Sequence, residues 1–393
     1  MTTRLEAIRL VARASILAGL LAWTGSAHAV LPIPSNTWVA QPTPSEVGLP
    51  GFSGSFQARG WSHLLYDSAR QRMIIWDGYL DASRPYSIYG NALWLYDAAA
   101  NQLNLETVTN WVRQDGQTVP LPENTTAPTP YDRHSYSTFT VVSSMNRVYL
   151  WAGANVSVPS NAFGDLWAYD FTTKQWHEIL PSFRPQTMFE QAMVWDPAAG
   201  RIVLFAGPTA AWQDGDRAWH FDPVSETWQD RATSPQPSGR AAQVMAYDSN
   251  RQGTWMFGGG SPWPNGGNEL WFYNGVSNQW ELVTTSGPKP SPRRFAGWAY
   301  DSRRDLLLLW GGVDSGDNGL NDTWIFRPAT RTWQQMSPAG SPPSGTPMAS
   351  DVAYDPVNDA FVLHHSGRFF LYRYDSSSGD LASPNAVQDL LAR

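Results

Sequence analysis

The sequence predicts an all-β fold, a propeller of six four-stranded antiparallel blades. An aromatic phrase recurs along the chain, and its tryptophans Trp167, Trp219, Trp271 and Trp324 lie 52, 52 and 53 residues apart. In most repeats this phrase follows a hydrophobic run that ends on an aspartate and a second run that ends on small residues. A repeat of about fifty residues built from short strands and turns is typical of radial propellers.

The aromatic phrase occurs six times. Five copies are regular and the last is degenerate, and they cover residues 93–97, 166–170, 218–222, 270–274, 323–327 and 370–375. The chain contains 21 Trp, 15 Tyr and 16 Phe, and such large rings bury much apolar area per residue. We therefore expect the repeated aromatics to fill the wedges between neighbouring blades.

A fixed register relates the repeats when the residue that ends each first strand is set at position zero. Five repeats have an aspartate there and the second has a valine: Asp67, Val142, Asp196, Asp248, Asp301 and Asp355. Eleven residues later the first five repeats have glycine and the sixth has Ser366. Glycine allows a positive φ at that turn. The aspartates accept amide hydrogen bonds from the turns that follow, so we interpret them as scaffold.

The ring is predicted to close through the N-terminal part of the chain. A lone tryptophan marks the last strand in repeats two to five, whereas the sixth repeat has none. Residues 35–42, which include Trp38, match the segment around Trp333. We expect this segment to be the outer strand of blade six, since pairing the two ends of the chain removes an exposed sheet edge.

The first 29 residues have the features of a signal peptide. A basic start, an apolar run from Ala14 to Trp23 and an A-x-A motif ending at Ala29 follow one another. We expect cleavage after Ala29 and a secreted or periplasmic protein. The propeller is predicted over 30–381 and a C-terminal tail over 382–393, with blades at about 57–106, 131–180, 187–230, 240–283, 293–336 and 347–375 plus 35–41.

Composition excludes several classes of partner and site. The formal net charge is −7, and loss of the leader would bring it to −9. An acidic chain without a basic run binds polyanions poorly, so we expect no nucleic-acid partner. No second hydrophobic stretch is long enough to cross a bilayer, so we expect no membrane insertion. The chain has no Cys and no metal or nucleotide motif, so we expect no cofactor and no metal.

The repeat resembles the kelch family. The resemblance rests on the small residues after the second strand, the Trp-x-Tyr-Asp phrase and the later tryptophan, and it covers residues 35 to 375. It implies a propeller like the central one of galactose oxidase, and similar proteins include an exported six-bladed sialic acid mutarotase. The copper radical oxidase of this family requires a tyrosine cross-linked to a cysteine. We exclude that activity because this chain has no Cys.

Long loops are predicted on one face of the propeller. The connections between second and third strands share this face with the connections between blades and with an insertion over 110–130, and loops on a rigid scaffold often carry binding residues. Unrepeated rings and guanidinium groups here suit a sugar or a protein surface. We predict as ligand contacts Tyr79, Arg84, Tyr86, Trp111, Arg133, Trp212 and Trp263. The alternative is that the rings only pack the loops against one another.

Blades one and six, neighbours across the ring closure, have polar residues where the other blades do not. Ten residues after position zero they have Asp77 and His365, and four residues before it they have His63 and Asp351. We predict two couples near the channel mouth, His63 with Asp351 and His365 with Asp77. A histidine held by a carboxylate is a possible general acid/base, and Glu190 on the inner strand of blade three is a candidate second group. Alternatively, these pairs only satisfy one another at an irregular seam.

Two functions follow from these features. The first is a binding module for a carbohydrate or an exported protein on the long-loop face, which agrees with the absence of a recognised catalytic motif. The alternative is an isomerase, a mutarotase or epimerase of the sialic-acid type. The isomerase requires His365 and Asp77 to lie within hydrogen-bond distance beside a cavity. The binding module allows them to be buried or far apart.

Overall fold

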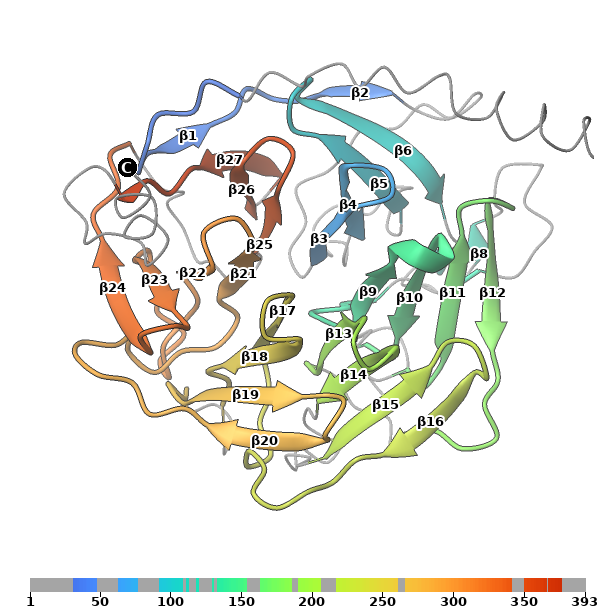
Figure 1. Cartoon of the computed structure of the whole chain (residues 1–393). Helices are drawn as coiled ribbons and strands as arrows, with labels where there is room; N and C mark the ends of the chain where they lie inside the picture. Colours follow the sequence, from blue (N-terminus) through green and yellow to red (C-terminus); the bar gives the residue numbers. More distant parts are fainter. Residues whose placement is uncertain are drawn as a thin grey trace, which may run out of the picture.

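Six antiparallel sheets stand around a central channel, and each sheet forms one blade (Figure 1). The structure is a computed structural model, and it describes residues 31–47, 63–76, 92–108, 111–112, 118–119, 129–130, 133–153, 163–185, 190–205, 217–260, 266–340, 350–365 and 367–376. In every blade the first strand lies nearest the channel and the others follow outward. The predicted six-bladed all-β propeller is confirmed.

The strands are short, and in each blade they follow one another from the channel outward. Blades one to three contain β3 (His63–Asp67), β4 (Arg72–Trp76), β5 (Ala92–Asp97) and β6 (Gln102–Val108); β9 (Phe139–Val142), β10 (Arg147–Trp151), β11 (Leu166–Asp170) and β12 (Gln175–Ile179); and β13 (Ala192–Asp196), β14 (Arg201–Phe205), β15 (Ala218–Asp222) and β16 (Thr227–Asp230). Blades four to six contain β17 (Val244–Asp248), β18 (Gly253–Phe257), β19 (Leu270–Asn274) and β20 (Gln279–Leu282); β21 (Gly297–Asp301), β22 (Leu306–Trp310), β23 (Thr323–Arg327) and β24 (Thr332–Met336); and β25 (Ser350–Asp355), β26 (Ala360–His365), β27 (Arg368–Tyr372) and β1 (Trp38–Ala40).

The N-terminal arm, residues 31–47, closes the ring as predicted. Strand β1 pairs antiparallel with β27, with Trp38 opposite Tyr372. A second short strand of the arm, β2 (Ser45–Val47), pairs in parallel with β6. The arm therefore crosses the seam between blades six and one, and it makes blade one five-stranded. Sequence reasoning did not predict β2.

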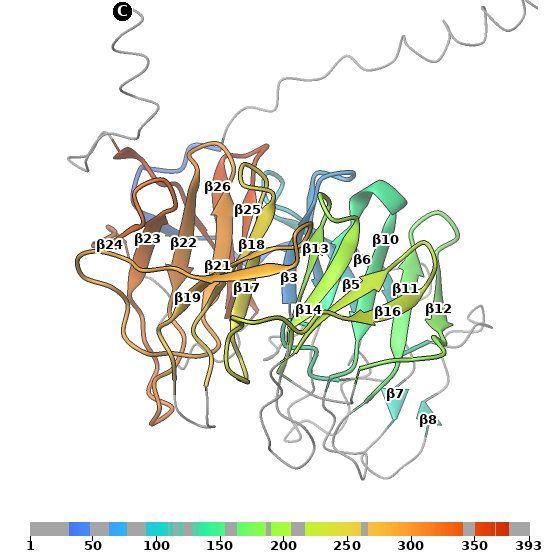
Figure 2. The same ribbon diagram turned by 60° about the horizontal axis from the view of Figure 1, so that its bottom comes forward.

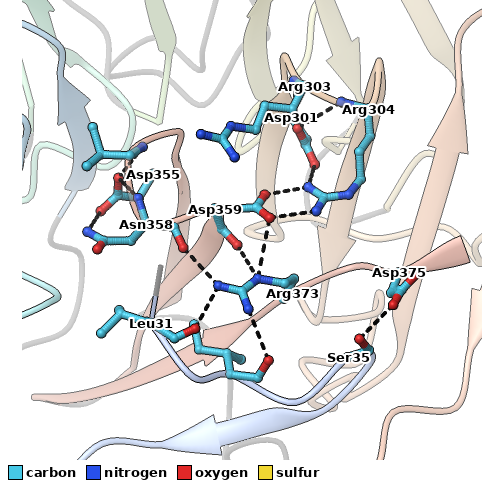
Figure 3. A network of polar contacts seen from close by, with 12 residues as sticks. Leu31, Ser35, Asp301, Arg303, Arg304, Asp355, Asn358, Asp359, Arg373 and Asp375 are labelled. Atoms are coloured by element: carbon cyan, nitrogen blue, oxygen red, sulfur yellow. Dashed lines mark hydrogen bonds and ion pairs between the residues drawn. The ribbon is translucent and has the colours of Figure 1, made fainter. Parts of the chain in front are cut away.

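Arg373 fixes the start of this arm (Figure 3). Its guanidinium donates hydrogen bonds to the carbonyl oxygens of Leu31 at 2.9 Å, Ile33 at 3.2 Å, Asn358 at 3.0 Å and Asp359 at 2.9 Å. Because the acceptors belong to both ends of the chain, one side chain joins the arm to blade six.

Aromatic rings fill the wedges between blades, as expected. The aromatic residue nine positions after zero packs against the lone tryptophan of the next blade, with centroid separations of 5.0 to 6.4 Å. The pairs are Trp76 with Trp176, Trp151 with Trp228, Phe205 with Trp280, Phe257 with Trp333, and Trp310 with Trp38. Trp38 thus continues the pattern across the ring closure.

The glycines eleven positions after zero meet a close backbone approach. Gly153 and Gly312 have φ values of +106° and +93°. A Cβ atom would lie 2.6 Å from the carbonyl oxygen of His134 at Gly153, and 2.8 Å from that of Arg294 at Gly312. The chain that enters each blade therefore rests directly on its glycine, and both effects favour a residue without a side chain.

A set of three polar residues, which we call the blade lock, recurs in blades two, four and five. In blade five, Arg293 donates to both carboxylate oxygens of Asp322 at 2.5 and 2.9 Å, and Asp322 also accepts from the indole nitrogen of Trp324 at 2.7 Å. The equivalent sets are Arg133, Asp165 and Trp167 in blade two, and Arg240, Glu269 and Trp271 in blade four.

Arginine side chains join neighbouring blades on one face of the ring. We call it the turn face because it carries the turns between first and second strands. Arg304 of blade five binds Asp301 of its own blade at 2.9 Å and both carboxylate oxygens of Asp359 of blade six at 2.5 and 2.7 Å (Figure 3). Arg251 joins Asp248 to Asp305 in the same way between blades four and five. The interpretation of the repeated aspartates as scaffold agrees with these contacts.

The other face, the loop face, carries the connections between second and third strands and those between blades. A hairpin of β7 (Trp111–Val112) and β8 (Thr118–Val119) belongs to the predicted insertion. Figure 2 shows this hairpin beyond one face of the ring of blades. Within the described part of the chain, no helix has the length and apolar character needed to cross a membrane.

Candidate functional site

The structure brings together one of the two predicted His/Asp couples. Nδ1 of His63, at the start of β3, forms an ion pair with Oδ2 of Asp351 in β25. The same oxygen accepts the amide of Leu64 at 2.8 Å. Both side chains are largely buried, with 12% and 14% of their surface exposed. The equal register of the two residues in neighbouring blades therefore places them in contact across the seam.

This couple lies in the wall of the channel. A cavity of about 230 Å³ is lined by the inner strands, and it includes His63 and Asp351 beside Ser137, Met193 and Met245. Because Asp351 holds Nδ1, it also sets the orientation of the imidazole, as a carboxylate does for a catalytic histidine. A small ligand in this cavity would lie within reach of a group that can exchange protons.

His365 lies in a largely buried, partly aromatic environment. It ends β26, is only 5% exposed, and its ring meets Trp310 of blade five at a centroid distance of 5.9 Å. The neighbouring His364 is completely buried, and burial lowers its pKa to about 3, so it is neutral at pH 7. The predicted partner Asp77 lies outside the described residues, so the contact between His365 and Asp77 stays a prediction.

Glu190 lies before the inner strand of blade three, not within it as predicted. Its backbone is left-handed, with φ +56°, and the residue is 5% exposed. Tyr136, Ala242 and Phe295, at the same position six residues before zero, also have left-handed backbones, with φ values of 50°, 57° and 55°. The strand expected at Glu190 is therefore replaced by a turn that recurs in blades two to five.

We call these four residues the mouth ring, because they follow the loop-face end of the channel. The amide of Ala242 donates to the carbonyl of Glu190 at 2.9 Å, and the amide of Phe295 donates to the carbonyl of Ala242 at 3.0 Å. These bonds lead from blade three through blade four to blade five. Three of the four mouth-ring residues are thus joined through their backbones in one arc.

Two aromatic rings meet across the mouth. Tyr136 and Phe295 come from blades two and five, which are opposite in a ring of six, yet their centroids are 6.1 Å apart with planes at 23°. Nδ1 of His134 lies 3.3 Å from the Tyr136 hydroxyl. Burial, and then the nearby Glu190 carboxylate, raise the pKa of Tyr136 well above its usual range. Tyr136 therefore remains protonated and keeps its hydrogen-bonding hydroxyl.

The charged groups beside the mouth ring are themselves held in place. Arg294, only 1% exposed, forms an ion pair with Asp317, and its guanidinium carbon is 5.9 Å from the Phe295 ring centroid. Burial lowers the pKa of His134 to about 3, so this histidine carries no charge at pH 7. The mouth therefore combines an aromatic centre with carboxylate and guanidinium groups at its edge.

Sequence reasoning missed the mouth-ring residues Tyr136 and Phe295, as well as their neighbours His134 and Arg294. The fixed register would have grouped the first two, since both stand six residues before position zero. Their left-handed backbone has no sequence signal, because tyrosine and phenylalanine are not residues that favour it.

The predicted ligand contacts have mixed outcomes. Arg133 is fully buried and bonds to Asp165 and the carbonyl of Ala152 in the blade lock. Sequence reasoning did not anticipate this structural role, and anion binding by Arg133 stays a prediction. Trp111 lies in β7, opposite Val119. The contacts that fall outside the described residues are Tyr79, Arg84, Tyr86, Trp212 and Trp263. Within the described ranges no group of three or more acidic or histidine side chains could hold a metal ion.

Comparison with known proteins agrees with the fold. Residues 138–357 match the KLHDC2/KLHL20/DRC7 Kelch-repeats domain. The chain belongs to the kelch-repeat family. This match extends over more than half of the chain, from blade two into blade six, and it confirms the resemblance seen in the repeated phrase.

Individual relatives match this chain only in part. It is 25% identical over 257 residues to mouse multiple epidermal growth factor-like domains protein 8, which is 62% of this chain and 9% of that protein. It is 34% identical over 92 residues to the bovine Rab9 effector protein with kelch motifs, which is 23% of this chain and 24% of that protein. The chain thus spans about a tenth to a quarter of the length of these curated relatives.

Proposed function

We propose that this kelch propeller is an exported binding module that takes a protein partner on its loop face. The observation that carries the proposal is the stack of Tyr136 and Phe295 across the channel mouth. This stack places apolar rings at the centre of the face, with charged groups around them. An aromatic centre with a polar rim is the usual composition of a protein-binding surface.

The backbone at the mouth ring supports a functional role for its side chains. A non-glycine residue in the left-handed region costs roughly 1–2 kcal/mol, whereas glycine adopts it freely. Tyr136, Glu190 and Phe295 have large and chemically different side chains at this strained position. Strained backbone with specific side chains is common at functional sites, so we infer that these side chains contact the partner.

A protein fits this surface better than a carbohydrate does. Sugars stack on open faces of aromatic rings, but Tyr136 and Phe295 each have one face directed at the other. The bovine relative is named as an effector of Rab9, which agrees with a role in recognition. Carbohydrate binding is the other outcome that the experiment below detects.

The test is a paired selection on the mature chain, residues 30–393. A phage-displayed random peptide library and a printed glycan array are applied to the wild type, to Phe295→Ala and to Val224→Ala. Val224 is 83% exposed and lies outside the mouth ring, so its variant is the control. We expect enriched peptides that bind the wild type and the control but bind Phe295→Ala at least tenfold more weakly. Glycan binding without peptide binding, or equal binding to all three proteins, would contradict the proposal.

Export is tested separately. The full chain, expressed in a bacterium with its first 29 residues, should be recovered outside the cytoplasm with a mass that begins at Val30. Recovery of the unprocessed chain from the cytoplasm would contradict the export part of the proposal and leave the binding part standing.

A second candidate function is the sugar mutarotase or epimerase, which the pairing of His63 with Asp351 beside the 230 Å³ cavity favours. In that reaction Nε2 of His63 would move a proton at the anomeric hydroxyl while Asp351 holds Nδ1. Exchange between sialic acid anomers, followed by NMR, should then accelerate with wild type and fall at least a hundredfold with His63→Asn. Exchange at the uncatalysed rate with the wild type excludes this function.

A further inference from the structure

The blade lock is incomplete in blade three. Two residues before the tryptophan of the aromatic phrase, blades two, four and five have the carboxylates Asp165, Glu269 and Asp322, but blade three has Arg217. The charge at this repeated position is therefore reversed. Arg217 instead forms an ion pair with Asp230, and both side chains are exposed to solvent by a third or more of their surface.

The missing carboxylate leaves Trp219 without its usual acceptor. In blades two, four and five the equivalent indole nitrogen donates to the carboxylate at 2.7, 3.0 and 2.7 Å. Nε1 of Trp219 is buried and has no hydrogen-bond partner among the residues that the structure describes, and the whole residue is only 7% exposed. A buried donor without an acceptor costs about 1–3 kcal/mol, so an acceptor from a partner would remove an existing defect.

An exposed aromatic ring packs on this indole, and a second exposed apolar side chain lies in the same connection. The ring of Phe183, which is 53% exposed, packs on Trp219 with centroids 5.6 Å apart. Leu180 is 77% exposed and precedes it in the connection from blade two to blade three. This connection belongs to the loop face. Large apolar side chains that remain exposed close together are typical of interaction sites.

The same region carries an exposed guanidinium on a chain whose net charge is −7. Arg217 precedes β15, where Trp219 lies, and its side chain is 54% exposed beside Asp230. We call Leu180, Phe183, Arg217 and Trp219 the blade-three corner. It combines an unsatisfied N–H donor, an exposed guanidinium and apolar surface.

We propose that the blade-three corner binds an acidic segment of a protein partner. A carboxylate of that segment accepts the hydrogen bond of Trp219 Nε1 beside Arg217, and a neighbouring apolar side chain packs on Phe183 and Leu180. The partner group takes the place that the chain's own carboxylates occupy in blades two, four and five. This inference rests on the proposed function, that the loop face binds protein, and it adds the chemistry of the partner.

The blade locks of blades two, four and five show how a carboxylate binds the equivalent indole. Asp165, Glu269 and Asp322 each accept from an indole and from an arginine at the same time. Charge-assisted bonds of this kind are stronger than neutral ones, so a carboxylate is preferred over an amide at this place.

The variant Arg217→Asp tests the inference because it restores the chain's own carboxylate. We expect the new carboxylate to accept the hydrogen bond of Trp219 Nε1 and so raise the melting temperature. The variant should bind a selected acidic peptide at least tenfold more weakly. Trp219→Phe, which removes the N–H donor together with part of the ring, should weaken the same peptide at least fivefold. The control is Arg368→Asp, since Arg368 is exposed in blade six, opposite blade three, and its variant has the same change in net charge. That variant should bind like the wild type.

The probe is the best peptide that the random library yields on the wild type, together with its Asp→Asn or Glu→Gln analogue, measured by fluorescence anisotropy. Loss of binding in the neutral analogue, in Arg217→Asp and in Trp219→Phe supports the inference. Peptides that lose affinity in Phe295→Ala but bind Arg217→Asp and Trp219→Phe normally would overturn it and leave the proposed function intact. A library that yields no peptide on the wild type contradicts both.

Discussion

Blades three and five have the same four-strand order but differ in their polar bonding. Blade five has a complete blade lock of Arg293, Asp322 and Trp324. Blade three has Arg217 in place of the acid, and the indole of Trp219 is unsatisfied. Both blades keep their four strands and their aromatic contacts. Strand pairing and ring packing are therefore sufficient for a blade, and the polar lock is an addition that a blade can lack.

Blades three and five also differ in their polar contacts on the turn face. Arg304 of blade five joins Asp301 to Asp359 of the next blade, whereas the equivalent residue of blade three is Ala199. Among the described residues, Asp196, the position-zero acid of blade three, has no arginine partner, and its carboxylate accepts the backbone amides of Ala198 and Ala199. Blade three is thus less satisfied at both ends. Residues that depart from a repeat at a cost in stability are the ones to examine for function.

The largest effect is expected from Asp322→Ala. It removes the carboxylate from Arg293, a residue with no exposed surface, and uncompensated charge at a broken buried pair typically costs about 3–5 kcal/mol. The free energy of unfolding from urea titration measures this. Asp230→Ala is the control in blade three, where the exposed pair with Arg217 should cost less than about 1 kcal/mol. Equal losses in the two variants would show that the lock does not distinguish the blades.

A smaller effect is expected when each blade loses its indole N–H. Trp324→Phe breaks a 2.7 Å bond to Asp322, whereas Trp219→Phe removes a donor that has no acceptor. Both variants lose similar packing, so Trp324→Phe should cost about 1–2 kcal/mol more in unfolding free energy. If Trp219→Phe is the more destabilising of the two, its indole has an acceptor after all.

The smallest effects concern pH and have opposite signs. Hydrogen bonds from Arg251 lower the pKa of Asp305, so its contribution to stability is present above the unfolded value and is lost as pH falls through the folded one. Burial raises the pKa of Asp196, so its contribution is present at low pH and is lost as pH rises through the folded value.

These signs predict how two matched variants behave in urea unfolding between pH 3 and pH 7. Asp305→Asn should be less stable than the wild type at pH 7, by about 1 kcal/mol, with the difference shrinking toward pH 3. Asp196→Asn should be slightly more stable than the wild type at pH 7 and no different at pH 3. A destabilised Asp196→Asn at pH 7 would mean that the carboxylate is stabilised in the folded blade.

The register of the repeat predicted which residues are equivalent in different blades and which of them meet between neighbouring blades. It placed Trp38 in blade six because Trp38 matches Trp333, and it paired His63 with Asp351 because both stand four residues before position zero in neighbouring blades. Such contacts follow from position alone. The structure has the same pairing of strands and of side chains at these places.

What the sequence did not predict depends on backbone conformation and on contacts across the channel. Tyr136 and Phe295 meet from opposite blades, and Glu190 occupies a left-handed turn that its residue type does not favour. Arg373 binds main-chain carbonyls, which every residue has, so no side-chain pattern marks its partners. The register shows that Arg217 replaces an acidic residue of the other blades. Only the structure shows the consequence, an indole of Trp219 without an acceptor among the described residues.

The N-terminal arm also determines when the molecule can be finished. Strand β1 is the first of the described strands along the chain, and its partner β27 is the last of them. Blades one to five have all their own strands before β27 exists, so they can form while the ring is still open. Ring closure is therefore the last step of folding, and it requires β27 to be free to pair with β1. A chain that ends before Tyr372 leaves β1 without its partner strand. Such an exposed strand edge can pair with other chains.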